Sequence, residues 1–295
     1  LPGRIPAAAW AAAGEAARPE RYARCEPFAA ERGLAATVCH LGNPDRAPTF
    51  ALWGDSHANA LGPGMHHAAR GLDTAGLLFF GSGCPALLGV DRPAREECRR
   101  FNREVNRTLQ GEPGIGLIYL AGYWTVPMTG SGYDKRFFLI EDEQTTGRSP
   151  SENGRVFARG LGRTLDALAD RRVVIIQDVP EVGSRFSKHL SDHFVRRAWL
   201  KIDGAAEPVY PLTEDPVEAR LTALIAARKD KVHFLRIRPV LCSDNRCPLR
   251  IDGALVYRDG DHLSDYGSRL LAPLLSRSLS RNLPGGTGPL KNGSS

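Results

Sequence analysis

Apolar strands alternate with helical stretches along most of this sequence, and the alternation constrains the fold more than any other feature. The runs predicted to form strands are 49–53, 75–80, 115–121, 172–179 and 232–240. Helices are predicted over about 57–70, 92–109, 151–170, 215–229 and 264–281. Continuous apolar strands are typical of a parallel sheet that is covered on both faces. We therefore expect a three-layer α/β/α sandwich with a mostly parallel sheet.

The two ends of the chain differ from this alternating part. Residues 1–48 are rich in Ala, Arg and Pro and show no clear strand, so we expect a helical or irregular extension. Residues 282–295 are rich in Gly, Pro and Ser, which predicts a disordered tail. Residues 49–281 are expected to form one domain, in which 129–150 and 181–213 resemble insertions.

The charge balance excludes few partners, but it argues against nucleic acid. The chain has 39 Lys plus Arg and 33 Asp plus Glu, a formal net charge of +6. Nucleic-acid modules usually cluster their basic residues, whereas here they are scattered among acids. No apolar stretch approaches the roughly 18 residues of a membrane-spanning helix. Because the chain starts at Leu1 rather than Met, we expect a fragment of a longer protein.

Six cysteines fall into three local pairs, Cys25 with Cys39, Cys84 with Cys98, and Cys242 with Cys247. Each pair closes a short loop, and the even count favours three disulfides over six free thiols in a cytosolic protein. Disulfides indicate an oxidising compartment. The sequence contains no Cys-x-x-Cys and no nearby paired His, so no metal site is predicted.

Ser56 lies where an apolar strand turns into a helix, directly after Gly54 and Asp55. A helix N-terminus offers unpaired backbone N–H groups that can stabilise an oxyanion. A serine hydroxyl needs a base to act as a nucleophile. The alternative is that Asp55 or Ser56 only caps the helix.

Asp259 and His262 provide the residue types that such a serine needs. They lie three positions apart, before a helix predicted to start near Ser264, so Asp259 can accept from one ring nitrogen of His262. The other nitrogen is then free to take a proton from a serine. Asp261 is expected to face elsewhere, as a cap or towards solvent. The alternative is a polar surface loop.

These segments resemble those of a known family. Phe50-Ala-Leu-Trp-Gly-Asp-Ser-His57 resembles the nucleophile block of the SGNH (GDSL-like) hydrolases, and Asp259-Gly-Asp-His-Leu-Ser264 resembles their Asp-x-x-His block. Together with Gly83-Cys84-Pro85, they are similar to the periplasmic SGNH domains fused to acyltransferase-3 membrane proteins of the O-antigen acetyltransferase type. The resemblance spans roughly 49–280 and implies a flavodoxin-like α/β/α fold.

The resemblance implies roles for individual residues. Ser56 would be the nucleophile, His262 the general base and acid, and Asp259 the residue that orients His262. The Ser56 N–H and Gly83 would form part of the oxyanion hole, with Asp55 and His57 near the substrate. The wider superfamily has Gly-x-Asn-Asp as its third block, but Leu120-Ala-Gly-Tyr-Trp124 contains no Asn. Trp124 would either donate its indole N–H to the oxyanion or wall the pocket.

The function implied by this resemblance is O-acyl transfer, with acetyl as the default group, onto a cell-envelope polysaccharide such as lipopolysaccharide O-antigen. No cofactor is expected on this chain, because the acyl group would come from acetyl-CoA through an upstream membrane domain. The domain would be a periplasmic monomer tethered to the inner membrane, with residues 1–48 as the link. The alternatives are a secreted carbohydrate O-acetyl esterase and a non-catalytic glycan-positioning domain.

Overall fold

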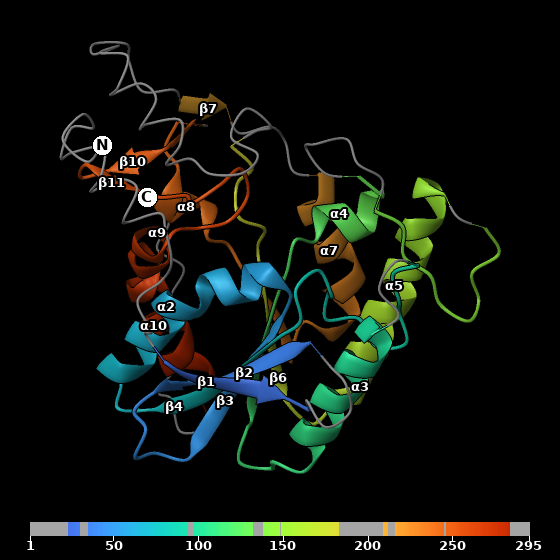
Figure 1. The fold of residues 1–295 in the computed structure, drawn as a ribbon, viewed down its shortest axis with the longest axis horizontal. Helices are drawn as coiled ribbons and strands as arrows, with labels where there is room; N and C mark the ends of the chain where they lie inside the picture. The colour runs from blue at the N-terminus through green and yellow to red at the C-terminus, as the bar shows by residue number, and fades with distance from the viewer. Residues whose placement is uncertain are drawn as a thin grey trace, which may run out of the picture.

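The computed structural model describes residues 23–29, 35–93, 97–131, 138–147, 149–182, 209–211, 216–244 and 246–283. Within these residues, a central sheet of seven strands lies between two layers of helices (Figure 1). The expected three-layer α/β/α sandwich is confirmed.

The sheet is mostly parallel. Its strands follow the order β1 (Arg24–Phe28), β2 (Ala36–Gly42), β4 (Ala75–Phe80), β3 (Pro48–Gly54), β5 (Leu117–Ala121), β6 (Arg172–Ile176) and β8 (Val232–Leu235). The pairs from β4 to β8 are parallel, whereas β1 with β2 and β2 with β4 are antiparallel. The chain passes from β3 to β4 on one side and then to β5 on the other. Ligands of open α/β sheets bind beyond the strand ends at such a switch point.

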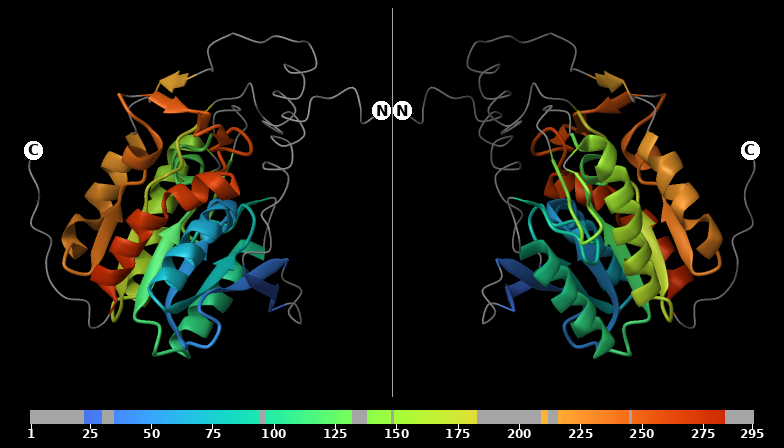
Figure 2. Two further views of the ribbon diagram at one scale, coloured as in Figure 1. Left: turned by 90° about the vertical axis from the view of Figure 1, so that its left-hand side faces the viewer. Right: turned by 90° about the vertical axis from the view of Figure 1, so that its right-hand side faces the viewer.

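Helices cover both faces of the sheet, as Figure 2 shows. One layer contains α2 (Ser56–Gly71), α9 (Asp265–Leu270) and α10 (Ala272–Asn282); the other contains α3 (Glu97–Gln110), α5 (Pro150–Ala167) and α7 (Pro216–Ile225). Side chains of β3 alternate between the layers: Phe50 and Leu52 pack towards α2, and Ala51 and Trp53 towards α3. This explains why β3 is a continuous apolar run, since both of its faces are buried.

Shorter elements connect and edge these layers. They are α4 (Thr125–Thr129), the 3₁₀ helix η4 (Ala226–Arg228), α8 (Arg238–Leu241), and two strand pairs, β7 (Val209–Pro211) with β9 (Arg246–Pro248) and β10 (Arg250–Ile251) with β11 (Ala254–Leu255). Among the described residues, no helix combines the length and apolar character needed to cross a bilayer.

Two sequence predictions about strands are wrong. Residues 1–48 were expected to contain no strand, but β1 and β2 belong to the central sheet. All residues of β1 except Phe28 are exposed, so the sequence shows no burial pattern there. The strand predicted over 232–240 ends at Leu235, and α8 follows it, with Pro239 in the first turn of the helix.

The three expected disulfides are confirmed: Cys25–Cys39, Cys84–Cys98 and Cys242–Cys247. Cys25 and Cys39 are directly opposite in the β1–β2 pair, so the first bridge fastens the edge strand to its neighbour. The second joins the turn after β4 to α3. The extension before residue 23, the tail after 283 and most of 181–213 lie outside the described residues, so those predictions stay predictions.

Part of the predicted insertion at 129–150 is fastened to α5. The buried carboxylate of Asp142 accepts from Arg159, at 2.7 and 2.9 Å, and from Arg163 at 3.1 Å. These hydrogen bonds, that of Arg159 above all, outweigh the cost of burial and hold the pKa of Asp142 far below its usual range. Residues 138–147 therefore pack on the domain through a charged anchor.

Candidate active site

The carboxyl ends of β3, β4 and β5 carry the predicted site residues to one edge of the sheet. Gly81 donates its backbone N–H to the Gly54 carbonyl at 3.2 Å, and Tyr123 donates its own to Asp55 at 3.1 Å. A Cβ atom on Gly54 would lie 1.6 Å from the Ala121 carbonyl oxygen, so only glycine allows this approach of β3 and β5. The segments that follow these three strands therefore meet at one edge of the sheet.

Asp55 caps helix α2, which begins at Ser56. One carboxylate oxygen of Asp55 accepts from the His57 N–H at 2.8 Å, and the other accepts from the Tyr123 N–H. Both oxygens therefore accept backbone N–H groups, one from the first turn of α2 and one from the loop after β5. The capping alternative holds for Asp55, which positions this turn, and the prediction that it meets an oxyanion or substrate finds no support in its contacts.

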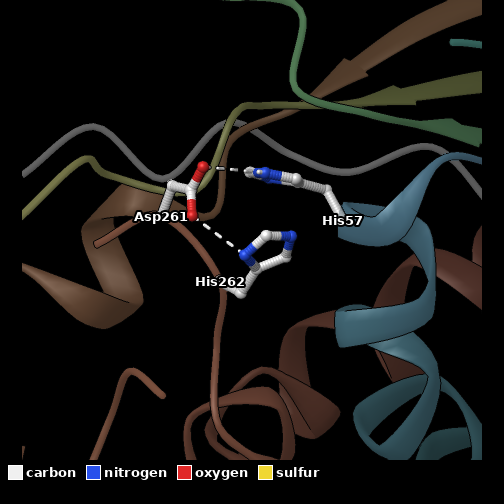
Figure 3. A group of neighbouring side chains, drawn as sticks. All are labelled: His57, Asp261 and His262. Carbon is white, nitrogen blue, oxygen red and sulfur yellow. Dashed lines mark ion pairs between the residues drawn. The ribbon is translucent and has the colours of Figure 1, made fainter. Parts of the chain in front are cut away.

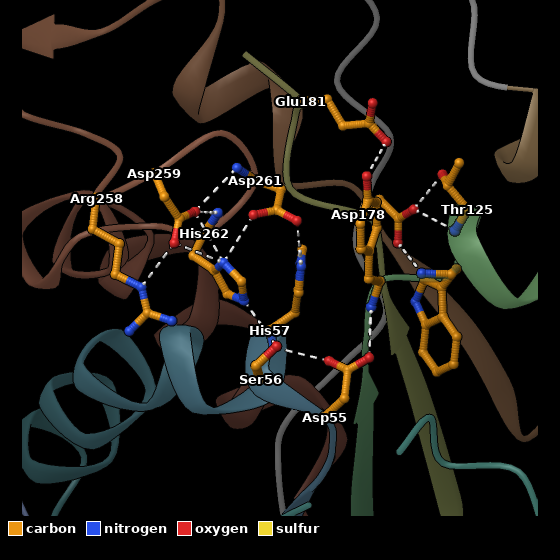
Figure 4. A network of polar contacts seen from close by, with 12 residues as sticks. Asp55, Ser56, His57, Thr125, Asp178, Glu181, Arg258, Asp259, Asp261 and His262 are labelled. Atoms are coloured by element: carbon orange, nitrogen blue, oxygen red, sulfur yellow. Dashed lines mark hydrogen bonds and ion pairs between the residues drawn. The ribbon is translucent and has the colours of Figure 1, made fainter. Parts of the chain in front are cut away.

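His262, which lies 206 positions after Ser56 in the sequence, connects Ser56 to Asp259. Its Nε2 lies 2.8 Å from the Ser56 hydroxyl oxygen, and its Nδ1 lies 2.9 and 3.0 Å from the two oxygens of Asp259 (Figure 4). Asp259 also accepts from the backbone N–H groups of Asp261 and His262, which closes the loop tightly. Ser56 and His262 are both half-buried, so the hydroxyl remains within reach of a substrate.

Asp261 also faces His262, which corrects the expectation that it points elsewhere. One of its oxygens lies 2.9 Å from His262 Nδ1, and the other lies 3.8 Å from His57 Nε2. The loop held by Asp259 turns the Asp261 side chain inward, where it is buried. Two carboxylates thus face the same ring nitrogen.

The two carboxylates change the acidity of the ring between them. Burial lowers the pKa of His262, but the contacts with Asp259 and Asp261 outweigh it and raise the pKa to about 9. Burial likewise opposes the ionised form of Asp261, but its contacts with His262 and His57 hold its pKa far below the usual range. The geometry favours an imidazolium beside ionised carboxylates.

His57 lies behind this group rather than at an open rim. Its side chain is only 2% exposed. The ring stacks on Tyr123, with centroids 4.7 Å apart, and approaches the His262 ring at 4.5 Å. Tyr123 in turn donates its hydroxyl to Glu181 at 2.5 Å, and burial raises the pKa of that carboxyl group. His57 therefore contacts the site from within the protein.

Trp124 is part of the core, which corrects both of its predicted roles. Its side chain is fully buried, packs edge-on against Phe157 and donates the indole N–H to the Ile176 carbonyl at 2.8 Å. Its backbone N–H donates to Asp178 at 2.7 Å. Neither N–H group of Trp124 is left for an oxyanion, and the buried ring does not wall a pocket.

Gly83 lies in the turn after β4, at the same edge of the sheet as Ser56. Its φ of +71° is in the left-handed region, which glycine adopts without strain. Its carbonyl accepts from Arg92 at 3.3 Å. The requirement for glycine thus has a backbone cause, and a role for its N–H in an oxyanion hole stays a prediction.

Comparison with known proteins decides the family. The model of the SGNH domain, described as fused to AT3 domains, matches residues 24–277. The chain belongs to this SGNH family. The match starts at β1, so the family's domain includes both strands that the sequence did not predict.

Solved structures show which folds resemble this SGNH domain. The periplasmic domain of the lipopolysaccharide acetyltransferase of Salmonella ser. Paratyphi A is 15% identical, with 80% of this chain and 85% of that chain covered and a TM-score of 0.52. The M. smegmatis aryl esterase is 12% identical, with 80% and 100% covered and a TM-score of 0.45. The first likeness shows a shared fold. A sequence search of curated proteins finds no match.

In this SGNH domain, a hydroxyl, an imidazole and a carboxylate form one hydrogen-bonded chain. Such a chain can remove a proton from the hydroxyl as it attacks a carbonyl and can return that proton to a leaving group. The Ser56 backbone N–H belongs to the first turn of α2, where the helix dipole favours negative charge. The arrangement is therefore suited to acyl transfer through a serine ester.

Proposed function

We propose that this domain is an O-acyltransferase that moves an acyl group, with acetyl the expected one, through an ester on Ser56 to a hydroxyl of a cell-envelope polysaccharide. The observation that carries the proposal is the His262 ring, 2.8 Å from the Ser56 oxygen and 2.9 Å from Asp259. Family membership supports it independently, because these domains are described as fused to AT3 domains.

The first half-reaction forms the serine ester. As the Ser56 oxygen attacks the acyl carbonyl, His262 Nε2 takes its proton and Asp259 stabilises the imidazolium. The oxyanion of the tetrahedral intermediate is met by the backbone N–H of Ser56, with Gly83 as a second donor. His262 then returns the proton to the leaving group, and the ester remains on Ser56.

The second half-reaction reverses these roles. A polysaccharide hydroxyl loses its proton to His262 as it attacks the ester, and the same proton returns to the Ser56 oxygen when the intermediate collapses. An acceptor with several hydroxyl groups is the expected substrate, with lipopolysaccharide O-antigen as the leading candidate. Which hydroxyl reacts depends on the bound acceptor.

The acyl group is proposed to come from an AT3 membrane domain upstream in the same protein, which would take it from acetyl-CoA. This chain would then bind no cofactor itself. Three disulfides support an oxidising compartment, and the Salmonella domain with the similar fold is periplasmic. We accordingly place the domain in the periplasm, tethered to the inner membrane.

The test uses p-nitrophenyl acetate as a simple acyl donor. Wild type should release nitrophenol, and Ser56→Ala should lower that rate by at least about 1000-fold, the scale seen when a triad member is lost. Ser280→Ala, which changes an exposed serine of α10, is the matched control and should keep the wild-type rate. Equal rates for all three proteins would refute the serine mechanism and favour a glycan-positioning domain.

The acceptor is tested next. A fluorophosphonate should label wild type once, at Ser56, which mass spectrometry of the peptide would verify. With an O-antigen oligosaccharide added, a transferase yields acetylated sugar. Release of acetate alone, at the same rate with and without sugar, would instead identify a carbohydrate esterase.

A further inference from the structure

His57 has an unusual environment for a buried histidine. Both of its ring nitrogens are buried, and neither has a hydrogen-bond partner among the described residues. Buried polar atoms are nearly always paired, so each exception requires an explanation. The carboxylate of Asp261 lies 3.8 Å from Nε2, which is too long for a hydrogen bond.

That distance suits two ligands of one metal ion. Zinc takes nitrogen and oxygen ligands at about 2.0 to 2.2 Å, so two ligands of a tetrahedral ion lie roughly 3.4 Å apart. One oxygen of Asp261 is 3.8 Å from His57 Nε2 and its other oxygen is 2.9 Å from His262 Nδ1, on either side of that value. One donor atom from each of the three residues lies within 4.8 Å of the others.

The types of donor atom and the local charge also favour a bound metal ion. Two imidazoles and one carboxylate form a set that zinc sites in proteins use, with the fourth position open. Besides Asp261, the carboxylates of Asp259 and Glu181 face this group. Arg258 lies beside Asp259 at 3.5 Å, and the charge of Arg238 also acts on Glu181. Asp178 also acts electrostatically on His57, so four carboxylates and two arginines surround this group.

We propose that His57, Asp261 and His262 form a site for a divalent transition-metal ion, of the Zn²⁺ type, and that the bound ion inhibits acyl transfer. Figure 3 shows the two rings and the carboxylate facing one another. The inhibitory effect rests on the function proposed for Ser56, whereas the binding does not.

The inhibition follows from the proton that a neutral imidazole carries. A metal ion on His262 Nδ1 leaves the remaining proton on Nε2, which faces the Ser56 oxygen at 2.8 Å. A protonated Nε2 has no lone pair for the Ser56 proton. The ion also takes the place of the Nδ1–H that Asp259 accepts. The metal-bound domain therefore has a serine and a histidine in contact but no base.

Binding is tested first, without any activity assay. Purified protein is freed of metal with a chelator and titrated with Zn²⁺ by calorimetry and with Co²⁺ by visible absorption, which reports a tetrahedral site. All six cysteines are in disulfides, so no thiol competes. We expect one ion per chain. Asp261→Asn and His57→Gln, which nearly keep side-chain size, should each weaken binding by at least about 10-fold.

The control is His67→Ala, an exposed histidine on the same helix as His57, which should bind like wild type. Thermal melts establish that each variant is folded. Absence of stoichiometric binding by wild type, or unchanged binding by both site variants, would overturn the site.

Inhibition is then measured with p-nitrophenyl acetate, as the ratio of rates with and without Zn²⁺ for each protein. Wild type should lose at least about 10-fold and recover fully with chelator, and both site variants should need at least about 10-fold more Zn²⁺ for the same loss. Binding without inhibition would overturn the inhibitory effect. If the protein binds the ion but has no serine-dependent activity, the metal site is kept and the proposed function is refuted. If the protein is active but binds no ion, the proposed function is kept and the metal site is refuted.

Discussion

Hydrogen bonding and burial act in opposite directions on the pKa of Asp178, so its ionisation tests which effect is larger. Its carboxylate accepts from the backbone N–H groups of Trp124 and Thr125 at 2.7 and 2.8 Å, and from the Thr125 hydroxyl at 2.6 Å. These donors favour the ionised form, whereas burial disfavours it. Burial is the larger effect and raises the pKa of Asp178 from 3.8 to about 6.

The shift predicts how stability depends on pH. A difference of about two pKa units corresponds to about 3 kcal/mol. Between the unfolded and folded pKa values, the folded state binds more protons at Asp178 than the unfolded state. The contribution of this group to stability therefore falls as the pH rises through that window, and it is constant above it.

The measurement is urea unfolding of wild type and Asp178→Asn at several pH values from about 4 to about 7. Asparagine cannot ionise, so the difference between the two free energies of unfolding isolates this carboxyl group from other titrating groups. That difference, wild type minus variant, should fall by about 3 kcal/mol across the range. Asp166→Asn is the control, an exposed carboxylate whose difference should change by less than about 1 kcal/mol. A difference that is flat or rises with pH would show that the three donors outweigh burial.

Three further predictions concern stability and rate. Asp142→Ala should lower the free energy of unfolding by about 3 kcal/mol in urea, because it removes the buried carboxylate that pairs with both Arg159 and Arg163 of α5; a loss below about 1 kcal/mol would contradict the anchor. Replacing Cys84 and Cys98 by serine should cost about 3 kcal/mol, since the bridge closes a loop of sequence separation 14, and an unchanged unfolding midpoint would refute this. Because His262 must be neutral to act as a base, kcat/KM for p-nitrophenyl acetate should rise with pH and level off near its pKa of about 9; a plateau already at about pH 6 would show that the carboxylates do not raise this pKa.

Much of the fold is readable from the sequence because the parallel strands are buried on both faces. Strands such as β3 and β6 are continuous apolar runs, and their carboxyl ends predict the edge where the site lies. Strand β1 has no such pattern, because four of its five residues are exposed. It is held instead by pairing with β2 and by the Cys25–Cys39 bridge, and neither contact leaves a periodic signal.

The candidate site, like the fold, can be predicted from the sequence only in part. Spacing predicts that Asp259 can reach His262, because both lie in one tight loop. It does not predict which way Asp261 points, since the direction is fixed by the two backbone N–H groups that bind Asp259. A loop of the form Asp-x-Asp-His offers two carboxylates to one ring, and this is the signal to look for. The indole N–H of Trp124 donates to the carbonyl of Ile176, which lies 52 positions away, so the local sequence does not predict this contact.

The burial of Trp124 bears on the choice between transfer and hydrolysis. With its indole N–H bonded to Ile176, the proposed oxyanion donors are the backbone N–H groups of Ser56 and Gly83. A missing donor slows acyl transfer by about 100- to 1000-fold, but it slows attack by water and by a sugar hydroxyl alike, since both pass through the same oxyanion. Preference for a sugar must then come from binding it, because an oriented hydroxyl reaches effective concentrations of about 10⁵ M or more. The residues that decide the outcome are accordingly those that hold the acceptor beside Ser56, rather than those that form the hydrogen-bonded chain behind it.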